Sequence, residues 1–471
     1  MTDRQPLPTP PDASVEDVLY AKRQKIYPRQ VHGMFAGLRV LGVTLLLGLY
    51  YVVPWLTWDG HQAVLFDLPA RKFYILGLTF WPQDFFYLAW LLVIAALSLF
   101  FFTALAGRLW CGYACPQTVW TELFLWIERK VEGDRNRQMK LDKRPLDATK
   151  FRIKATKHGL WLLLSAWTGF TFVGYFTPIT ELWGALFALT LGPWETFWIL
   201  FYGLATYGNA GWMREQVCIY MCPYARFQSA MFDRDTLIIS YDAQRGEPRG
   251  SRKRNLDHRA AGLGDCVDCT LCVQVCPTGI DIRDGLQYQC IGCAACIDAC
   301  DDVMAKIGYP KGLIRYTTEN AMQGKIAHIL RPRVVFYALF LLALGGGLVY
   351  SISQRIPVEL DVIRDRNVLY RETEMGLIEN VYTLKLVNMD DQTHRFQLSV
   401  AGLVGLELDL GQDVVQLAPG EVRSLPVRVR IDPINLQRPS NEISFMLESL
   451  DDPELQTRQS GRLIGPAAGA H

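Results

Sequence analysis

Two runs of cysteines with one shared spacing constrain the fold of this 471-residue chain more than any other feature. The runs are Cys266, Cys269, Cys272 and Cys276, followed by Cys290, Cys293, Cys296 and Cys300. In both, the gaps are two, two and three residues, and Pro277 follows the first run. Chance does not produce such a pattern twice within 35 residues. The segment must therefore fold around something that thiolates hold.

The spacing is that of bacterial ferredoxins with two iron–sulfur clusters, in which three close thiolates hold one cluster and the fourth crosses to the other. This rule predicts one [4Fe–4S] cluster on Cys266, Cys269, Cys272 and Cys300, and a second on Cys276, Cys290, Cys293 and Cys296. Paired C-x-x-C units also build zinc sites. Two runs that each end with a cysteine three residues further on fit iron–sulfur better, which makes electron transfer the expected chemistry.

A second pair of cysteine motifs has the form C-x-x-x-C-P. It comprises Cys111 with Cys115 and Cys218 with Cys222. Positions i and i+4 share one face of a helix, so each pair can chelate a soft metal if the region is helical, with the proline at a helix start or kink. Thiolates select Cu(I), and Met213 or Met221 can add a thioether. Structural packing and disulfide exchange remain as alternatives.

Five apolar segments have roughly the 20 residues that a membrane span needs. They are residues 35–56, 84–105, 158–177, 190–210 and 334–352. The fourth is the weakest because Glu195 interrupts it, and a re-entrant segment around 181–192 remains open. Glu195 is a candidate for proton handling or for helix capping, and His158 is more simply a hydrogen-bonded interfacial residue than a metal ligand.

Basic residues predict the orientation of these spans. The 106–157 loop is densely basic, whereas the 178–189 loop has no Lys or Arg. The positive-inside rule then places the N-terminus, that loop and the cluster segment in the cytoplasm, and the C-terminal region outside. All twelve cysteines fall on the cytoplasmic side, where thiols stay reduced. The net charge of +1 gives no indication of a nucleic-acid partner.

The predicted fold class is a multi-domain membrane protein: an α-helical bundle of about five spans, an inserted two-cluster ferredoxin-like domain and a C-terminal β-sandwich. The expected segments are a cytoplasmic tail (1–34), helices 1–4 with both C-x-x-x-C-P motifs (35–230), a basic linker (231–262), the cluster domain (263–330), a fifth span (334–352) and an immunoglobulin-like sandwich (357–465). Alternating runs at 381–388, 394–402, 421–431 and 442–450 predict strands of that sandwich.

The order of these motifs resembles the FixG/CcoG/RdxA family of accessory proteins for cbb3-type cytochrome c oxidase. The resemblance rests on WCGYACPQTVW (110–120), VCIYMCPYARFQSAMFD (217–233), YDAQRGEPRG (241–250), the two-cluster run and the last span with its immunoglobulin-like tail. It covers nearly the whole chain. Membership implies a protein of the bacterial inner membrane that reduces Cu(II) to Cu(I) at the cytoplasmic side.

The resemblance implies that Cys111, Cys115, Cys218 and Cys222 are the copper-reducing or copper-binding thiols. Expected partners are copper ions, an unidentified electron donor, and the copper transporter or assembly factors that load the oxidase; a homo-oligomer is left open. Two other functions compete. One is a quinol-linked ferredoxin subunit that feeds a partner reductase, and the other is a cluster-based redox sensor.

Overall fold

The computed structural model describes residues 25–58, 60–252, 260–365, 368–390, 392–411 and 414–466. Residues 1–24 of the predicted tail and 253–259 of the predicted linker lie outside these ranges. The chain divides into two compact units. Unit 1 comprises Met1–Leu56 and Ala95–Leu341, and unit 2 comprises Thr57–Ile94 and Leu342–His471.

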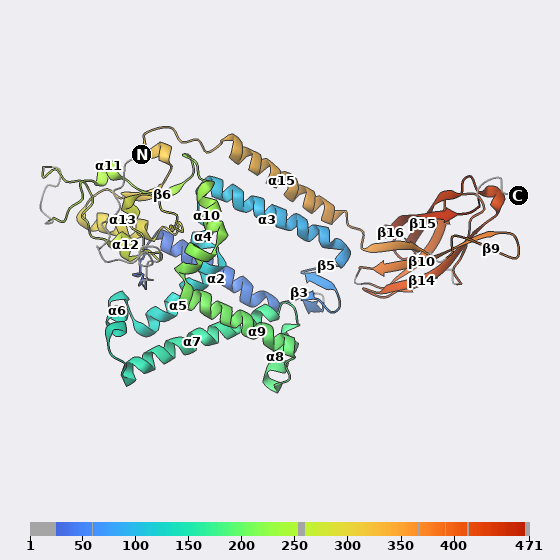
Figure 1. Cartoon of the computed structure of the whole chain (residues 1–471), viewed down its shortest axis with the longest axis horizontal. Helices are drawn as coiled ribbons and strands as arrows, with labels where there is room; N and C mark the ends of the chain where they lie inside the picture. Colours follow the sequence, from blue (N-terminus) through green and yellow to red (C-terminus); the bar gives the residue numbers. More distant parts are fainter. Residues whose placement is uncertain are drawn as a thin grey trace, which may run out of the picture. The chain divides into compact units, whose positions relative to one another are not determined.

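Three helical spans of the described chain are long and apolar enough to cross a membrane: Met34–Trp55, Pro82–Ala106 and Pro332–Ser353. They contain α2 (Met34–Val52), α3 (Phe85–Ala106) and α15 (Pro332–Ser353) (Figure 1). The first half of α3 packs along the second half of α15, where the Tyr87 hydroxyl lies 3.1 Å from the carbonyl oxygen of Ser351. These helices indicate a membrane protein.

The predicted third and fourth spans take a less regular form. The third, predicted at 158–177, overlaps α7 (Ala148–Val173) and runs into the turn after it; the N-terminal half of α7 carries lysines, and α7 is not among the helices apolar enough to span. The fourth lies in a bent pair, α8 (Ile179–Ala188) with the helix from Pro193 to Met213, which turns by 98°. Counted as one span, the pair brings the described total to four, so five spans remain a prediction.

The amphipathic helix α5 (Pro116–Glu132) carries a buried ion cluster against α7 and the segment after α9 (Pro193–Thr206). Glu128 accepts a hydrogen bond from Arg214 at 2.7 Å and lies 3.4 Å from the Lys157 ammonium. Lys157 also pairs with Glu132 at 2.8 Å. A short helix, α6 (Arg135–Lys143), follows, and its Asp142 adds a further carboxylate that pairs with Lys25 and Lys154.

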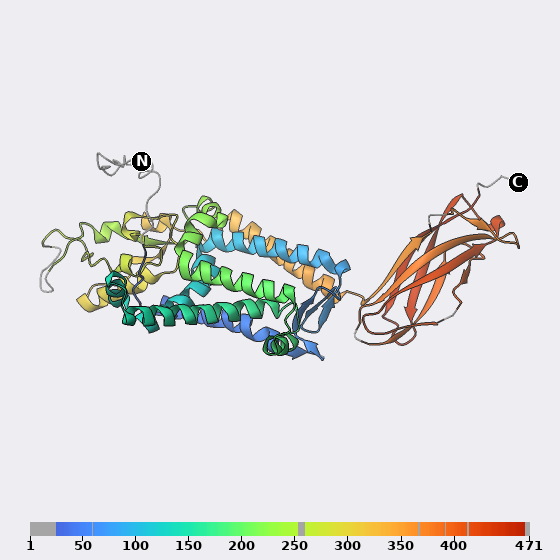
Figure 2. The ribbon, with the colours of Figure 1, turned by 60° about the horizontal axis from the view of Figure 1, so that its bottom comes forward.

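The cluster domain, green to yellow in Figure 2, is closed by a two-stranded antiparallel sheet. Strand β6 (Ile238–Tyr241) precedes the cysteine runs, and β7 (Ile314–Thr317) follows them; Ile238 pairs with Thr317 and Tyr241 with Ile314. Between them lie α11 (Ala243–Gly246), α12 (Leu271–Gln274), the 3-10 turn η5 (Ile282–Asp284) and α13 (Ala295–Ile307); α14 (Glu319–Met322) follows β7.

Helix α13 also caps the first apolar helix. The N-cap position of α2 is Gly33, which has no side chain to accept from the exposed N–H groups. Asp298 of α13 supplies the acceptor, at 3.2 Å from the N–H of Phe35 and 2.7 Å from that of Ala36. A carboxylate at this end also complements the positive helix terminus. The cluster domain and α2 are thus joined by charge-assisted hydrogen bonds.

Unit 2 contains strands where the sequence suggested only a loop between spans. A hairpin of β1 (Thr57–Trp58) and β2 (His61–Gln62) precedes a three-stranded sheet of β3 (Val64–Asp67), β4 (Lys72–Ile75) and β5 (Leu78–Phe80). Arg355, just after α15, pairs with Asp84 at 2.5 Å. The glycine turn at Gly420 lies against Trp81, which ties the small sheet to the C-terminal domain.

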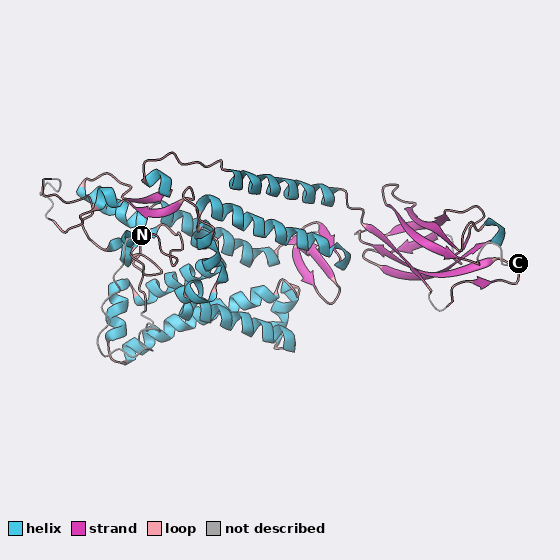
Figure 3. Cartoon of the chain, turned by 45° about the horizontal axis from the view of Figure 1, so that its top comes forward, coloured by secondary structure: helices cyan, strands magenta, loops and turns pink. Residues whose placement is uncertain are grey.

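The C-terminal domain is a sandwich of two antiparallel sheets, as the sequence predicted (Figure 3). One sheet orders β12-β14-β10-β8 with β9 on β10, and the other orders β13-β11-β15-β16. The strands are β8 (Val358–Arg364), β9 (Arg371–Glu372), β10 (Ile378–Asn388), β11 (His394–Ala401), β12 (Glu407–Asp409), β13 (Val414–Leu417), β14 (Val422–Ile431), β15 (Ser440–Ser449) and β16 (Gln456–Ile464). Alternate residues such as Leu384, Phe396 and Phe445 form its core.

Candidate functional site

The eight cysteines of the repeated runs gather around two separate cavities in the cluster domain. One cavity is lined by Cys266, Cys269, Cys272 and Cys300. The other is lined by Cys276, Cys290, Cys293 and Cys296, with Cys272 at its edge. In each, three cysteines come from one run and the last cysteine comes from the other run. The thiols surround a space rather than meeting at a point, which fits a four-iron cluster.

The backbone repeats between the two loops. Thr270 and Ala294 hold equivalent places, directly after the second cysteine of each run, and both adopt the left-handed conformation, with φ of 57° and 58°. Asp268 and Gly292, directly before that cysteine, have φ of 51° and 70°. Residues other than glycine rarely adopt this left-handed backbone conformation. Its occurrence at matching positions shows that both loops wrap their cavities in the same way.

The two cavities differ in exposure. Cys269 of the first is exposed although Cys266 and Cys272 beside it are buried, whereas the four cysteines of the second are all half-buried. Arg283 lies beside the first cavity and pairs with Asp281 at 2.6 Å and with Asp268 at 2.5 Å. Arg39 of α2 donates to the carbonyl oxygen of Cys293 beside the second. The first cavity therefore faces solvent, and the second faces the apolar helices of unit 1.

Each C-x-x-x-C-P motif places its first cysteine within one short helix and its second at the N-cap of the next. Cys111 lies in α4 (Leu109–Tyr113), and Cys115 is the N-cap of α5 with Pro116 at its first position. In the second motif Cys218 lies in a π-helical turn, η4 (Val217–Met221). Cys222 caps α10 (Pro223–Ala230), again with proline at the first position.

This arrangement corrects part of the sequence prediction. The prolines do begin helices, as expected, because a missing N–H costs nothing at that position. The two cysteines of a motif, however, do not share one face of a continuous helix, because the backbone turns between them. A second π-helical stretch, η3 (Tyr207–Met213), lies just upstream of Cys218. Such π-helical turns are rare in proteins as a whole but common at functional sites.

The four thiols of the two motifs lie close enough to interact electrostatically. Burial raises the pKa of Cys111 to about 12, and the nearby thiols of Cys115, Cys218 and Cys222 act in the same direction. Burial likewise raises the pKa of Cys218 to about 11. At Cys115, burial raises the pKa while the N–H groups of Gln117 and Thr118 at the start of α5 oppose it. A cation that binds these thiols as thiolates displaces protons.

Arg108 connects this group of thiols to the second cluster cavity. Its guanidinium is buried, donates to the carbonyl oxygen of Cys290 at 3.0 Å, and also donates to that of Ala225. Its charge opposes the raised pKa of Cys111 and of Cys218. The buried amide of Gln228 lies 3.5 Å from the Cys111 sulfur. Arg108 therefore links the two sites: it hydrogen-bonds to the second cluster loop and acts electrostatically on the thiols of Cys111 and Cys218.

The backbone of the first motif touches the second cluster loop directly. A methyl group built on Gly112 would lie 2.8 Å from the carbonyl oxygen of Gly292 and 3.1 Å from the Cα of Cys293. These neighbours are backbone atoms, which cannot move aside as a flexible side chain can. Gly112 thus permits the closest approach between the motif and the loop that contains Cys293.

Replacing Gly112 with valine should lower the stability of the detergent-solubilised protein by about 1–3 kcal/mol, since overpacking forces the backbones apart. Thermal unfolding followed by circular dichroism measures the change. Gly159→Val in α7 is the matched control, because a methyl group there meets no atom within 4 Å. Equal melting temperatures for G112V and the unmodified protein would contradict the contact.

Sequence reasoning missed the residues that join the two sites. Arg108 stands three residues before Cys111, and Arg39 stands in an apolar helix. The signal in the sequence that could have identified them was a single basic residue next to an apolar run. Of the other candidates, His158 bonds to the Tyr207 hydroxyl at 2.9 Å and stacks on Trp212, as an interfacial residue would. Glu195 occupies the first turn of α9. Met221 is exposed and Met213 is half-buried.

Comparisons with known proteins agree with this architecture. Family models match a 4Fe–4S binding domain at residues 88–132, a 4Fe–4S dicluster domain at 213–319, and the immunoglobulin-like fold at the C-terminus of FixG at 348–466. The first match contains Cys111 and Cys115, and the second contains the other ten cysteines.

Three curated relatives span most of the chain. The nitrogen fixation protein FixG of Rhizobium meliloti is 39% identical, over 97% of this chain and 96% of the relative. RdxA and RdxB of Cereibacter sphaeroides are 42% and 43% identical, over 83% and 85% of this chain and 85% and 87% of theirs. Together with the two cysteine-lined cavities, this similarity shows that the chain belongs to the FixG/RdxA family of iron–sulfur electron-transfer proteins.

Proposed function

We propose that the protein is a cupric reductase of the bacterial inner membrane, which reduces Cu(II) to Cu(I) for the assembly of cbb3-type cytochrome c oxidase. One observation carries the proposal: the four thiols of the C-x-x-x-C-P motifs lie near enough to act on one another electrostatically, and their motifs adjoin the second cluster loop through Arg108 and Gly112. A site for a soft metal ion thus lies next to a site for a one-electron cofactor.

The cluster ligands in this proposal are the cysteines that line each cavity. Cys266, Cys269, Cys272 and Cys300 would hold the first [4Fe–4S] cluster, and Cys276, Cys290, Cys293 and Cys296 the second. Each cluster supplies one-electron transfer when bound. The chain's own residues place the two cavities side by side, leave Cys269 exposed and hold the half-buried second set beside Arg39 of α2.

Copper is the substrate, and the thiols of Cys111, Cys115, Cys218 and Cys222 would receive it. Reduction adds one electron to each Cu(II) ion, and thiolate sulfur prefers the Cu(I) product. The described residues contain no group of three or more His, Cys, Asp or Glu side chains arranged around a single ion. Two thiolates suffice for Cu(I), and a loosely held ion suits a protein that must pass its product on.

The location proposed for each part follows from charge and chemistry. The N-terminus and the cluster domain lie in the cytoplasm, where thiols stay reduced, and the β-sandwich lies in the periplasm. Copper transporters or oxidase assembly factors are the partners that would take up Cu(I).

Replacing Cys111, Cys115, Cys218 and Cys222 together with alanine should abolish Cu(II) reduction. The assay uses protein that has been reduced with dithionite and then separated from the excess reductant. A colorimetric Cu(I) chelator measures the product. Cluster absorbance and iron content should be unchanged, because these thiols do not line either cluster cavity. Cu(II) reduction at the unmodified rate in this variant would refute the assignment of the site.

A further inference from the structure

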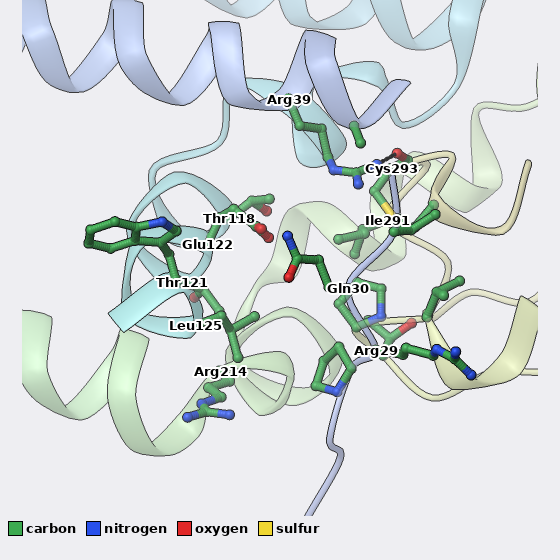
Figure 4. Close-up of a pocket in the computed structure, with 18 of the residues that line it drawn as sticks. Arg29, Gln30, Arg39, Thr118, Thr121, Glu122, Leu125, Arg214, Ile291 and Cys293 are labelled. Atoms are coloured by element: carbon green, nitrogen blue, oxygen red, sulfur yellow. Dashed lines mark hydrogen bonds between the residues drawn. The ribbon is translucent and has the colours of Figure 1, made fainter. Parts of the chain in front are cut away.

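A cavity of about 560 Å³ in unit 1 lies between the apolar helices and the second cluster loop. Its walls come from the segment that leads into α2, the first turns of α2, the N-terminal half of α5, and the cluster domain. Figure 4 shows Arg39 and Cys293 on one side, with Thr118, Thr121 and Leu125 of α5 across from them. The volume is within the usual range for small-molecule sites.

The position of the cavity relates it to both metal-binding regions. Cys293 and Pro277 of the second cluster loop form part of one wall. Cys218 of the second C-x-x-x-C-P motif forms part of another. A molecule in the cavity therefore shares a wall with a proposed cluster ligand, Cys293.

The charges in the walls argue against copper as the occupant. Four arginines line the cavity (Arg29, Arg39, Arg129 and Arg214), against two glutamates (Glu122 and Glu215). Arg129 pairs with Glu122 at 3.1 Å and Arg214 with Glu128 at 2.7 Å, but the excess charge stays positive. A divalent cation is repelled by such a wall. A neutral molecule is not repelled, and its oxygen atoms can accept hydrogen bonds from the arginines.

The remaining lining is mainly apolar and continues onto the surface of α2. Val31, Ala36, Leu125 and Ile291 line the cavity, with Val40 at its rim. Val40 is 61% exposed, and Leu41 beside it is 53% exposed, on a helix long enough to span a membrane. The apolar lining thus continues onto an exposed face of a helix long enough to span a membrane, which favours a lipid-soluble occupant.

We propose that this cavity binds a hydroquinone from the membrane and that the hydroquinone is the electron donor. The inference rests on the proposed function, because it names the donor for the same reductase. Oxidation to the quinone breaks two O–H bonds and releases two protons and two electrons. The electrons match two one-electron clusters in their oxidised form, and the protons pass to the carboxylates of Glu122 and Glu215 and then to water. Arg39 positions an oxygen of the ring beside Cys293.

Two glycines of α2 provide a matched test. Gly37 lines the cavity and Gly48 does not, and a methyl group built on either meets no atom within 4 Å. Phenylalanine at Gly37 should fill the cavity, whereas phenylalanine at Gly48 should point into open space. Neither change is expected to weaken the helix, because glycine is among its poorest formers.

The probe is heptyl-hydroxyquinoline N-oxide, a quinol analogue whose fluorescence is quenched on binding. It should bind the unmodified protein and the Gly48→Phe variant alike, and bind Gly37→Phe at least about tenfold more weakly. Anaerobic duroquinol should give the electron paramagnetic resonance signal of reduced clusters in the first two proteins only. Dithionite should give that signal in all three, which shows that the clusters are intact.

Equal binding of the probe and equal reduction of the clusters by duroquinol in all three proteins would overturn the proposal. Loss of probe binding in all three when phospholipid is added would also overturn it, because the cavity would then be a lipid site. Copper reduction by dithionite-treated Gly37→Phe should match the unmodified protein. If no protein reduces copper but the binding difference persists, the proposed cupric reductase fails while the hydroquinone site stands.

Discussion

Replacing Cys300 with alanine should remove the cluster held by Cys266, Cys269 and Cys272, although Cys300 belongs to the other run. The thiol of Cys300 lines the same cavity as those three. Cys276→Ala should in turn remove the cluster of the second run, since Cys276 lines that cavity. Each single change should lower the iron content from about eight to about four atoms per chain.

Iron content alone does not identify which cluster is lost, so the spectra must be compared in pairs. Reduced Cys300→Ala should give the same paramagnetic resonance spectrum as Cys266→Ala, because both retain the second cluster. Reduced Cys276→Ala should match Cys290→Ala. The cluster beside the exposed Cys269 and the cluster of the half-buried second set should give distinguishable spectra, since solvent exposure affects cluster properties. A match between Cys300→Ala and Cys290→Ala would show that the clusters do not share ligands in this way.

Arg214→Met should lower the free energy of unfolding by about 1–3 kcal/mol, because it removes the closest cation of the buried Glu128 carboxylate and leaves Lys157 at 3.4 Å as its partner. The Glu128 side chain is 1% exposed and that of Arg214 is 8% exposed, and they lie 2.7 Å apart. Methionine retains much of the bulk of arginine, so the loss reports charge rather than volume. Thermal or denaturant unfolding in detergent measures the effect.

The effect of Arg214→Met should depend on pH in a defined direction. Burial acts to raise the pKa of Glu128, but Arg214, Lys157 and Lys25 outweigh it and the pKa is lowered. The ion pair therefore stabilises the fold at pH values above the unfolded-state pKa, and this contribution is lost as the pH falls through the folded-state pKa. The difference between the unmodified protein and Arg214→Met should shrink in acid.

A second substitution separates charge from structure in the same experiment. Glu128→Gln combined with Arg214→Met removes both charges and should recover part of the lost stability, because neutral replacement of a buried pair costs far less than breaking it. A double variant no more stable than Arg214→Met would show that Glu128 is not the source of the effect.

Features carried by short-range spacing could be predicted from the sequence. The cysteine runs predicted two groups of thiols, and strict alternation predicted strands such as β10, β11, β14 and β15 within three residues at each end. Residue type and local period determine these features, since a strand that buries one face must alternate. The ferredoxin-type cluster domains and the C-terminal sandwich were thereby predicted, whereas the five spans and their insertion in a membrane stay predictions.

Features that depend on long-range contacts could not be predicted in this way. The contact of Gly112 with Gly292 joins residues 180 positions apart. The cavity has walls from four distant segments (26–40, 117–129, 214–218 and 275–295), and no local pattern marks its lining. Turns can also mislead: C-x-x-x-C suggested one helix face, but the proline after each motif starts a new helix and the backbone turns before it.

The pairing of β6 with β7 has a consequence for how such a chain can be built. Neighbouring strands lie about 4.8 Å apart, so the cluster domain leaves and rejoins the rest of the chain at almost the same point. An insert whose ends meet imposes little strain on the helices that precede and follow it. The length of the electron-carrying part between these strands can thus change without moving the helices on either side, as long as its contacts with α2 and Gly112 are kept.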